Sequence, residues 1–152
     1  MKRWTTFAAL VFALHFAWEM MQAKWFESMQ GLPLSRATLT CARASFGDLV
    51  ITALAFTLAA LVGGGAKWPT SRRVLVAAAV FIATGIAITA GYERFALGRG
   101  MWRYDDTMPI LFGIGALPLL QWLLLPLIEV MLFRLIDKRA SGGPAAVVAC
   151  IG

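Results

Sequence analysis

The chain has 152 residues, of which 60% are hydrophobic and 14% are charged, and its mean hydropathy is +0.74. This composition excludes a soluble globular domain and predicts a polytopic membrane protein. The net charge of +6 could suit nucleic acid, but Lys and Arg of membrane proteins gather at helix ends, where anionic lipid attracts them. We therefore expect a lipid bilayer, and no nucleic acid, as the partner of the basic residues.

Four apolar runs predict an all-α fold, a four-transmembrane-helix bundle. Each run is close to or above the roughly 20 residues that a bilayer requires, and the runs cover residues 4–23, 45–63, 74–92 and 108–135. The last run contains Pro118 and Pro126, which each remove a backbone hydrogen bond, so we expect a kinked fourth helix. Residues 1–140 form one transmembrane domain in this prediction, and residues 141–152 form a mobile tail.

The distribution of basic residues predicts the orientation. With four spans, eight of the 14 Lys and Arg residues fall on the side of the termini: Lys2, Arg3, Lys67, Arg72, Arg73, Arg134, Lys138 and Arg139. This bias predicts a bacterial inner-membrane protein with both termini in the cytoplasm. Cys41 and Cys150 would then lie on opposite sides of the membrane, so we expect no disulfide between them.

His15 and Glu19 are the most informative pair in the first run. His15 is the only histidine, and Glu19 follows four residues later, so a helix places both on one face, about 6 Å apart. An unpaired carboxylate in hydrocarbon is costly, so both side chains should face the interior of the bundle. We expect Glu19 to pair with His15 or Arg43.

Asp48 has two compatible interpretations. Ser45 with Asp48 three residues later is typical of a capping box, which would begin the second helix near Ser45. Asp48 also heads a small, weakly polar stripe on the face that continues with Thr52, Ala55 and Ala59. The sequence leaves the capping role and the site role open.

The third run contains a stripe of small residues at four-residue intervals, which predicts a packing seam: Ala79, Ala83, Ala87 and Gly91. Glu93 follows at the end of this helix, and Trp102 and Tyr104 in the next loop are expected to be membrane-interface anchors.

The fourth run carries two further polar residues. Gln121 is expected to form a hydrogen bond across the bundle. Glu129, about 30 Å along a helix that starts at Met108, is expected near the opposite interface, paired with basic residues.

The antiparallel order of the helices brings acidic residues together. The end of the first helix, the start of the second, the end of the third and the start of the fourth share one leaflet. Glu19, Asp48, Glu93 and the pair Asp105 and Asp106 therefore fall at similar depth, and His15 lies one turn deeper. This convergence predicts an inward-facing cluster of one imidazole and several carboxylates near the outer leaflet.

Three functions remain open for this cluster. The leading hypothesis is an accessory or structural subunit, a homo-oligomer or the partner of another membrane protein, in which Glu19 is paired, Asp48 caps its helix and Glu93 is solvated. The second is a cation, proton or divalent metal site with His15, Glu19, Asp48 and Glu93 as ligands, a metal ion being the only cofactor considered. The third is an intramembrane enzyme for a lipid or isoprenoid, with Glu19 as general acid and His15 or Asp48 as its proton partner.

Two local likenesses accompany these hypotheses. Segments 92–94, 100–104 and 116–121 together resemble the small membrane carotenoid cyclases and hydratases. That family carries a Pro-x-Glu-Glu signature where this chain has Pro118-Leu119-Leu120-Gln121, so the resemblance implies no catalytic residue here. A wider set of segments resembles small four-span bacterial inner-membrane proteins and implies no activity: His15-Phe16-x-Trp18-Glu19, Gly47-Asp48, Tyr92-Glu93 and Met108-Pro109.

Overall fold

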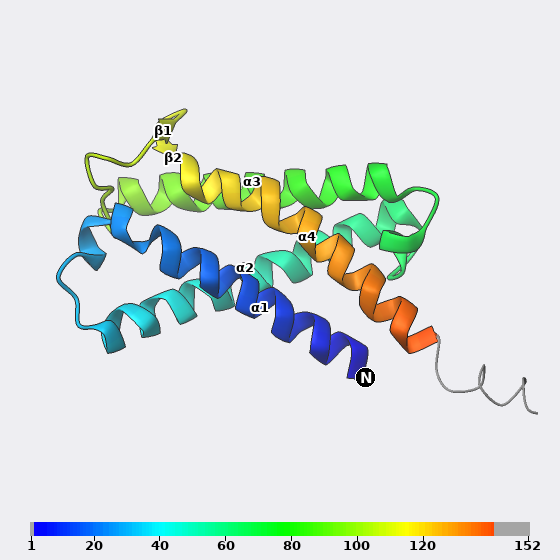
Figure 1. Ribbon diagram of the computed structural model, residues 1–152. Coiled ribbons are helices and arrows are strands. Elements are labelled where there is room, and N and C mark those ends of the chain that lie inside the picture. The colour runs from blue at the N-terminus through cyan, green and yellow to red at the C-terminus, as the bar shows by residue number, and fades with distance from the viewer. Residues whose placement is uncertain (1, 142–152) are drawn as a thin grey trace, which may run out of the picture.

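A computed structural model describes residues 2–141, and it is all-helical. Its four long helices are α1 (Lys2–Gln22), α2 (Leu34–Gly63), α3 (Val74–Gly98) and α4 (Ala116–Ser141). Each helix contacts the next in the order α1, α2, α3, α4, and α4 also contacts α1, so the four surround one interior (Figure 1). The connections contain short elements: η1 (Ala23–Trp25), η2 (Glu27–Met29), η3 (Trp68–Thr70), β1 (Ile110–Leu111) and β2 (Ile114–Gly115). The predicted tail, with Cys150, lies outside the described residues except for Ser141.

Three of the described helices, α2, α3 and α4, are long and apolar enough to cross a membrane. α1 has 21 residues, which is a sufficient length, but it is not among the three. Its hydropathy is lowered by polar side chains, among them His15, Glu19 and Gln22. Composition and length thus support the membrane assignment through three helices.

α2 begins much earlier than the sequence predicts. It starts at Leu34, directly after Pro33, and runs for 30 residues, about 45 Å at 1.5 Å per residue. Ser45 therefore lies inside the helix, where its hydroxyl donates to the Cys41 carbonyl at 2.7 Å. The predicted capping box of Ser45 and Asp48 is wrong, because no helix begins there. The helix ends as expected at the glycines, with Gly64 in the left-handed conformation.

α4 begins later than predicted. Residues 108–115 are not helical, and they include the antiparallel strands β1 and β2, in which Ile110 pairs with Gly115. The turn between the strands has positive φ at Phe112 and Gly113, as two-residue hairpin turns require. Pro118 lies in the first turn of α4, where its missing N–H breaks no helical hydrogen bond. Only Pro126 lies inside the helix, and a kink there stays a prediction.

The apolar core lies at the end of the molecule that holds the α2–α3 connection. Trp68 of η3 is fully buried and packs with residues of α2 and α3, namely Ala55, Ala59, Ala77 and Phe81. A Cβ at Gly63 would overlap with the Trp68 side chain, so this glycine permits the close approach. α2 and α3 are therefore tightly joined at this end.

The small-residue stripe of α3 faces outward. Ala79, Ala83, Ala87 and Gly91 are all exposed, so the predicted packing seam within the chain is wrong. The buried face of α3 is offset by two positions and carries Ala77, Phe81, Gly85, Thr89, Glu93 and Ala96. Gly85 makes the closest approach, because a Cβ there would overlap with the Trp122 indole of α4. Regular spacing alone did not decide which face of α3 turns inward.

Candidate functional site

His15 lies at the centre of a polar cluster that joins three helices. Its side chain is fully buried, and its Nε2 lies 2.8 Å from Oε1 of Glu129 on α4. On the other side of the ring, Nδ1 lies 2.8 Å from Nε2 of Gln121 and 3.4 Å from Oδ2 of Asp48 on α2. The imidazole therefore bridges two carboxyl groups that belong to different helices.

The hydrogen bonds define two protonation states of this cluster. When the Gln121 amide donates to Nδ1, the ring is neutral, and its proton sits on Nε2 and is donated to Glu129. When Nδ1 is protonated as well, its N–H faces the Asp48 carboxylate, and the imidazolium lies between two acids. The same Gln121 amide donates to Asp48 Oδ2 at 3.0 Å and so holds this carboxyl beside the ring. A change between these two states requires the Gln121 amide to turn away from Nδ1, because this amide can donate only to an unprotonated ring nitrogen.

Glu129 was assigned to the wrong depth by sequence reasoning. It is fully buried beside His15, whereas we predicted an interfacial position with basic partners. Because α4 begins at Ala116 and not at Met108, Glu129 comes 13 residues into the helix, about 20 Å from its start. The missed signal is the four-residue spacing of Gln121, Leu125 and Glu129, which places all three on one face. The Oε2 atom of Glu129 has no hydrogen-bond partner within residues 2–141.

Glu19 occupies a separate position from the His15 ring. Its Oε1 accepts a hydrogen bond of 2.7 Å from Gln22, and the Gln22 oxygen in turn accepts one of 3.1 Å from Trp18. The predicted ion pair with His15 or Arg43 does not occur among the described residues. Glu19 instead lines a cavity that Asp48 also lines.

Glu93 is buried at the other end of this cavity, not solvated. Its Oε2 accepts hydrogen bonds from the Trp102 indole, at 3.2 Å, and from the Tyr104 hydroxyl. Trp102 and Tyr104, which we expected to be interface anchors, therefore attach the α3–α4 connection to α3. Burial, together with the hydrogen bond to the nearby Glu93, raises the pKa of Tyr104 above its ordinary value, so this phenol stays protonated and remains a donor.

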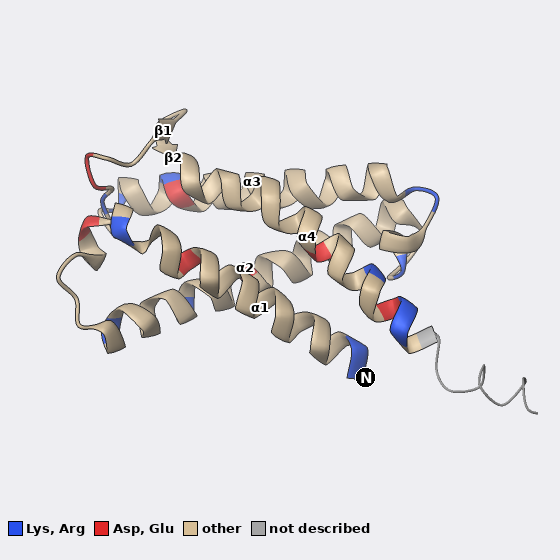
Figure 2. Cartoon of the chain, in the orientation of Figure 1, with Lys and Arg blue, Asp and Glu red and all other residues tan. Residues whose placement is uncertain are grey.

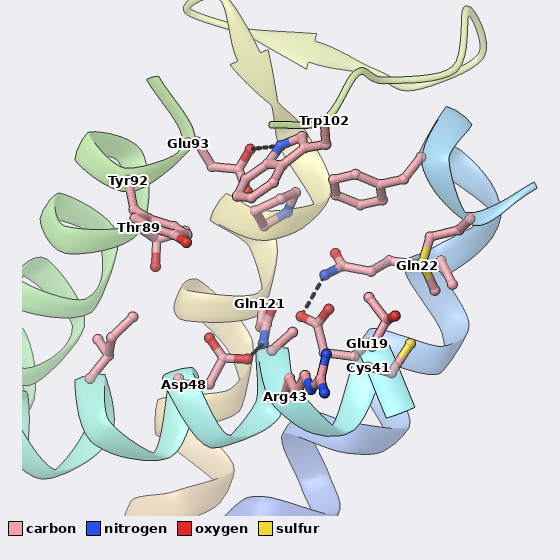
Figure 3. A pocket seen from close by; sticks show the side chains of 18 of the residues that line it. Glu19, Gln22, Cys41, Arg43, Asp48, Thr89, Tyr92, Glu93, Trp102 and Gln121 are labelled. Carbon is pink, nitrogen blue, oxygen red and sulfur yellow. Dashed lines mark hydrogen bonds between the residues drawn. The ribbon is translucent and has the colours of Figure 1, made fainter. Parts of the chain in front are cut away.

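The cavity has a volume of about 660 Å³ and lies between α1, α2, α3 and the first turns of α4. Figure 3 shows Asp48, Glu19 and Gln121 at one end and Thr89, Tyr92, Glu93 and Trp102 at the other. Between them the wall is mainly apolar, with Ile51 and Ile88 among the lining residues. Glu19, Asp48 and Glu93 thus converge on one space, in agreement with the predicted topology.

The two connections at this end are joined into a cap. An isolated β-bridge pairs Phe26 with Tyr104. The Glu27 backbone N–H donates to the Arg103 carbonyl at 3.1 Å, and the Asp105 backbone N–H donates to the Trp25 carbonyl at 2.9 Å. The Gln30 amide also donates to the Asp105 carboxylate at 2.7 Å. Asp105 therefore holds the cap together and does not line the cavity.

The rim of the cavity lies on the sides of the helices. Six of its lining residues are exposed on α2 and α3: Thr40, Arg43, Ala44, Gly47, Val50 and Tyr92. Because the cap covers the helix ends, a molecule would reach the cavity between α2 and α3, sideways, rather than along the helix axes.

The donor groups do not form a metal centre in the part of the chain that the structure describes. No group of three or more His, Cys, Asp or Glu side chains is placed to hold a metal ion there. Both nitrogens of His15 face protein partners, and Glu93 is held by Trp102 and Tyr104. The hypothesis of a metal site of His15, Glu19, Asp48 and Glu93 stays a prediction without geometric support. Cys41 is a buried free thiol among the described residues, and its predicted lack of a bond to Cys150 stays a prediction.

Comparison of the chain with protein families, with curated proteins and with solved structures found no match. The resemblances noted in the sequence therefore stay expectations, and the functional argument rests on the geometry of the cluster and the cavity.

Proposed function

We propose that this chain is a four-span protein of a bacterial inner membrane, and that it is an acid–base enzyme for a largely apolar substrate that enters the cavity from the bilayer. The observation that carries the proposal is the double position of Asp48, which contacts the buried His15 ring and also lines the cavity. A proton held by the cluster can therefore reach a bound molecule without passing through bulk water.

α1 is the fourth span in this proposal. Its His15 and Gln22 side chains are buried against the other helices, while exposed positions such as Leu10 and Met21 are apolar. A helix of modest mean hydropathy can therefore present a lipid-compatible surface when its polar face is covered by neighbours. Lys and Arg lie mainly toward the helix ends and connections (Figure 2), and the majority on the side of the termini supports a cytoplasmic location for both.

Each polar residue has a role in the proposed chemistry. Asp48 donates a proton to the substrate, for instance to a carbon–carbon double bond, and His15 returns a proton to Asp48. Glu129, buried beside Nε2, orients the ring and stabilises the imidazolium form. Glu19, on the same cavity, accepts a proton from the neighbouring carbon, so a double-bond shift balances in atoms and charge without any cofactor. After the product leaves, Glu19 returns this proton across the cavity to the pair of Asp48 and His15, which restores the starting protonation states.

Deuterium labelling tests this proposal. The protein is placed in lipid nanodiscs in D₂O with a total lipid extract of the membranes in which it was expressed, and the lipids are analysed by mass spectrometry. We expect one lipid species to gain carbon-bound deuterium, and Asp48→Asn to lower the rate by about 100-fold or more, the usual size of an acid–base contribution. Glu27→Gln, an exposed acid outside the cavity, is the matched control. Equal labelling by Asp48→Asn and the unchanged protein contradicts the proposal.

The accessory role remains the second candidate, because one observation favours it. Every nitrogen of His15 is satisfied by Glu129, Gln121 or Asp48, and such a network can fix the register of α1, α2 and α4 without chemistry. The exposed small residues of α3 then offer a face for a second copy or a partner membrane protein. Asp48→Asn distinguishes the two roles: the accessory role predicts lost stability or assembly and no labelling in any variant.

A further inference from the structure

The end of the cavity near Glu93 holds a buried carboxyl group without a cationic partner. The Glu93 side chain is 7% exposed, and none of the ion pairs in the described chain includes it. Both of its hydrogen bonds reach Oε2, which leaves Oε1 for another donor. The adjacent Arg94 is directed away, toward the Phe112 carbonyl at 3.2 Å. A buried carboxylate is stabilised by a cationic partner, so this end of the cavity favours a cationic ligand.

Aromatic rings surround the same end. Phe26, Tyr92 and Trp102 all line the cavity. The Trp102 ring lies 5.6 Å from Tyr92 and 6.5 Å from Phe26, measured between ring centroids. Such ring faces attract organic cations, and they favour an ammonium group with an apolar body over a hydrated metal ion.

Thr89 supplies the independent sign of a ligand. Its side chain is 9% exposed and lines the cavity one helical turn before Glu93 (Figure 3). Its hydroxyl has no hydrogen-bond partner within the described residues. Buried hydroxyls are seldom left unpaired, so a polar hydrogen of the ligand is expected here.

We propose that the cavity binds a long-chain amine in its protonated form, with the ammonium group between Glu93 and Thr89 and against the aromatic rings. The ammonium donates N–H bonds to Glu93 Oε1 and Thr89 Oγ1, and the apolar chain extends past Ile51 and Ile88 toward Asp48. The cavity volume of about 660 Å³ lies within the range of about 300–1,000 Å³ typical of ligand sites. This inference rests on the proposed function, because it names the substrate class for the same cavity: the amine anchors the molecule while the chain meets the acid–base residues.

Direct binding tests the inference. Tritiated dodecylamine, dodecanol and dodecanoate are titrated against the protein in phosphatidylcholine nanodiscs, and partitioning into empty nanodiscs is subtracted. We expect saturable binding of one dodecylamine per protein, about tenfold tighter than dodecanol because the charge interacts with both the rings and the carboxylate. Glu93→Gln and Thr89→Val should each weaken amine binding severalfold, and Glu27→Gln should leave it unchanged. Dodecanol or dodecanoate binding as tightly as the amine overturns the inference.

Glu93→Asp is the control that separates loss of the charge from loss of folding. It keeps the negative charge, so it should retain the preference for the amine over the alcohol even where Glu93→Gln loses it. An equal preference in Glu93→Gln and the unchanged protein also overturns the inference.

The binding and labelling experiments can fail separately. Asp48→Asn should lower the rate of deuterium transfer by about 100-fold or more and retain amine binding, because Asp48 lies at the opposite end of the cavity (Figure 3). Amine binding without any lipid labelling contradicts the proposed enzyme activity and supports the amine site. Lipid labelling that dodecylamine does not inhibit contradicts the amine site and supports the proposed enzyme activity.

Discussion

His15 and Glu129 are 114 positions apart in the chain, yet Nε2 of the imidazole lies 2.8 Å from Oε1 of the carboxyl group, and both side chains are fully buried. This contact connects the first long helix to the last. It also explains how α1 can hold a histidine in an otherwise apolar setting, because the ring exchanges water for two carboxyl partners.

Removal of one partner of this pair should be strongly destabilising. Glu129→Leu leaves the buried Nε2–H of His15 without an acceptor, and we expect a loss of about 3 kcal/mol or more in the free energy of unfolding. The double variant His15→Phe with Glu129→Leu should recover part of that loss, because the buried Nε2–H is then removed together with its acceptor, while Gln121 and Asp48 keep their hydrogen bond to each other. Titration with sodium dodecyl sulfate in mixed micelles measures both, with the exposed Lys138→Leu as control. Additive losses in the double variant would argue against a direct pair.

Gly85 and Gly91 provide a matched pair of substitutions on α3. Gly85→Ala should destabilise the protein by about 1–3 kcal/mol, because the added methyl group overlaps with the Trp122 ring. Gly91→Ala meets no atom within 4 Å, so it should be neutral or slightly stabilising through its better helix propensity. Thermal unfolding of both variants in one detergent makes the comparison. A similar change in both would mean that the close contact of α3 and α4 is absent.

The cap should loosen at acidic pH. Hydrogen bonds from the Thr107 hydroxyl, the Thr107 N–H and the Gln30 amide lower the pKa of the exposed Asp105 carboxyl. A lowered pKa in the folded state means that the stabilisation is complete above the ordinary pKa of about 4 and is lost as the pH falls through the lower folded value. Hydrogen exchange of the amides in residues 25–30, followed from pH 6 to pH 2.5 and corrected for intrinsic exchange rates, should show this loss of protection.

The control for the cap is Asp105→Asn. It removes the titrating group, so its amides in residues 25–30 should show weaker protection at pH 6 and a flatter dependence on pH. Protection in the unchanged protein that stays constant down to pH 2.5 would contradict the role assigned to Asp105.

Access to the cavity should depend on the gap between α2 and α3. Gly47 lies on the rim with no atom within 4 Å of a Cβ, so Gly47→Trp can narrow the mouth without disturbing the core. We expect dodecylamine association to slow by about tenfold or more, since the ligand would have to await a rarer opening of the mouth. Gly91→Trp, also without a neighbour within 4 Å but outside this cavity, is the control. Unchanged association in Gly47→Trp would place the route elsewhere.

Local pattern was sufficient for much of the architecture. Helical class and membrane-length helices follow from hydropathy, which is summed over neighbouring residues and needs no knowledge of the fold. The inward orientation of His15 and of the stripe headed by Asp48 also follows from local spacing, since Thr52, Ala55 and Ala59 are buried as that face predicts. The antiparallel order of the helices then brought Glu19, Asp48 and Glu93 to one cavity.

The partners of these residues depended on the tertiary structure. Composition does not reveal that α2 starts at Leu34 or that a hairpin delays α4 to Ala116, yet these boundaries set the depth of every later side chain. Glu129 therefore lies beside His15 and not at the membrane interface, and Trp102 and Tyr104 both donate hydrogen bonds to Glu93. A sequence specifies which side chains need a partner, because burial without one is costly, but only the packed helices decide which group supplies it.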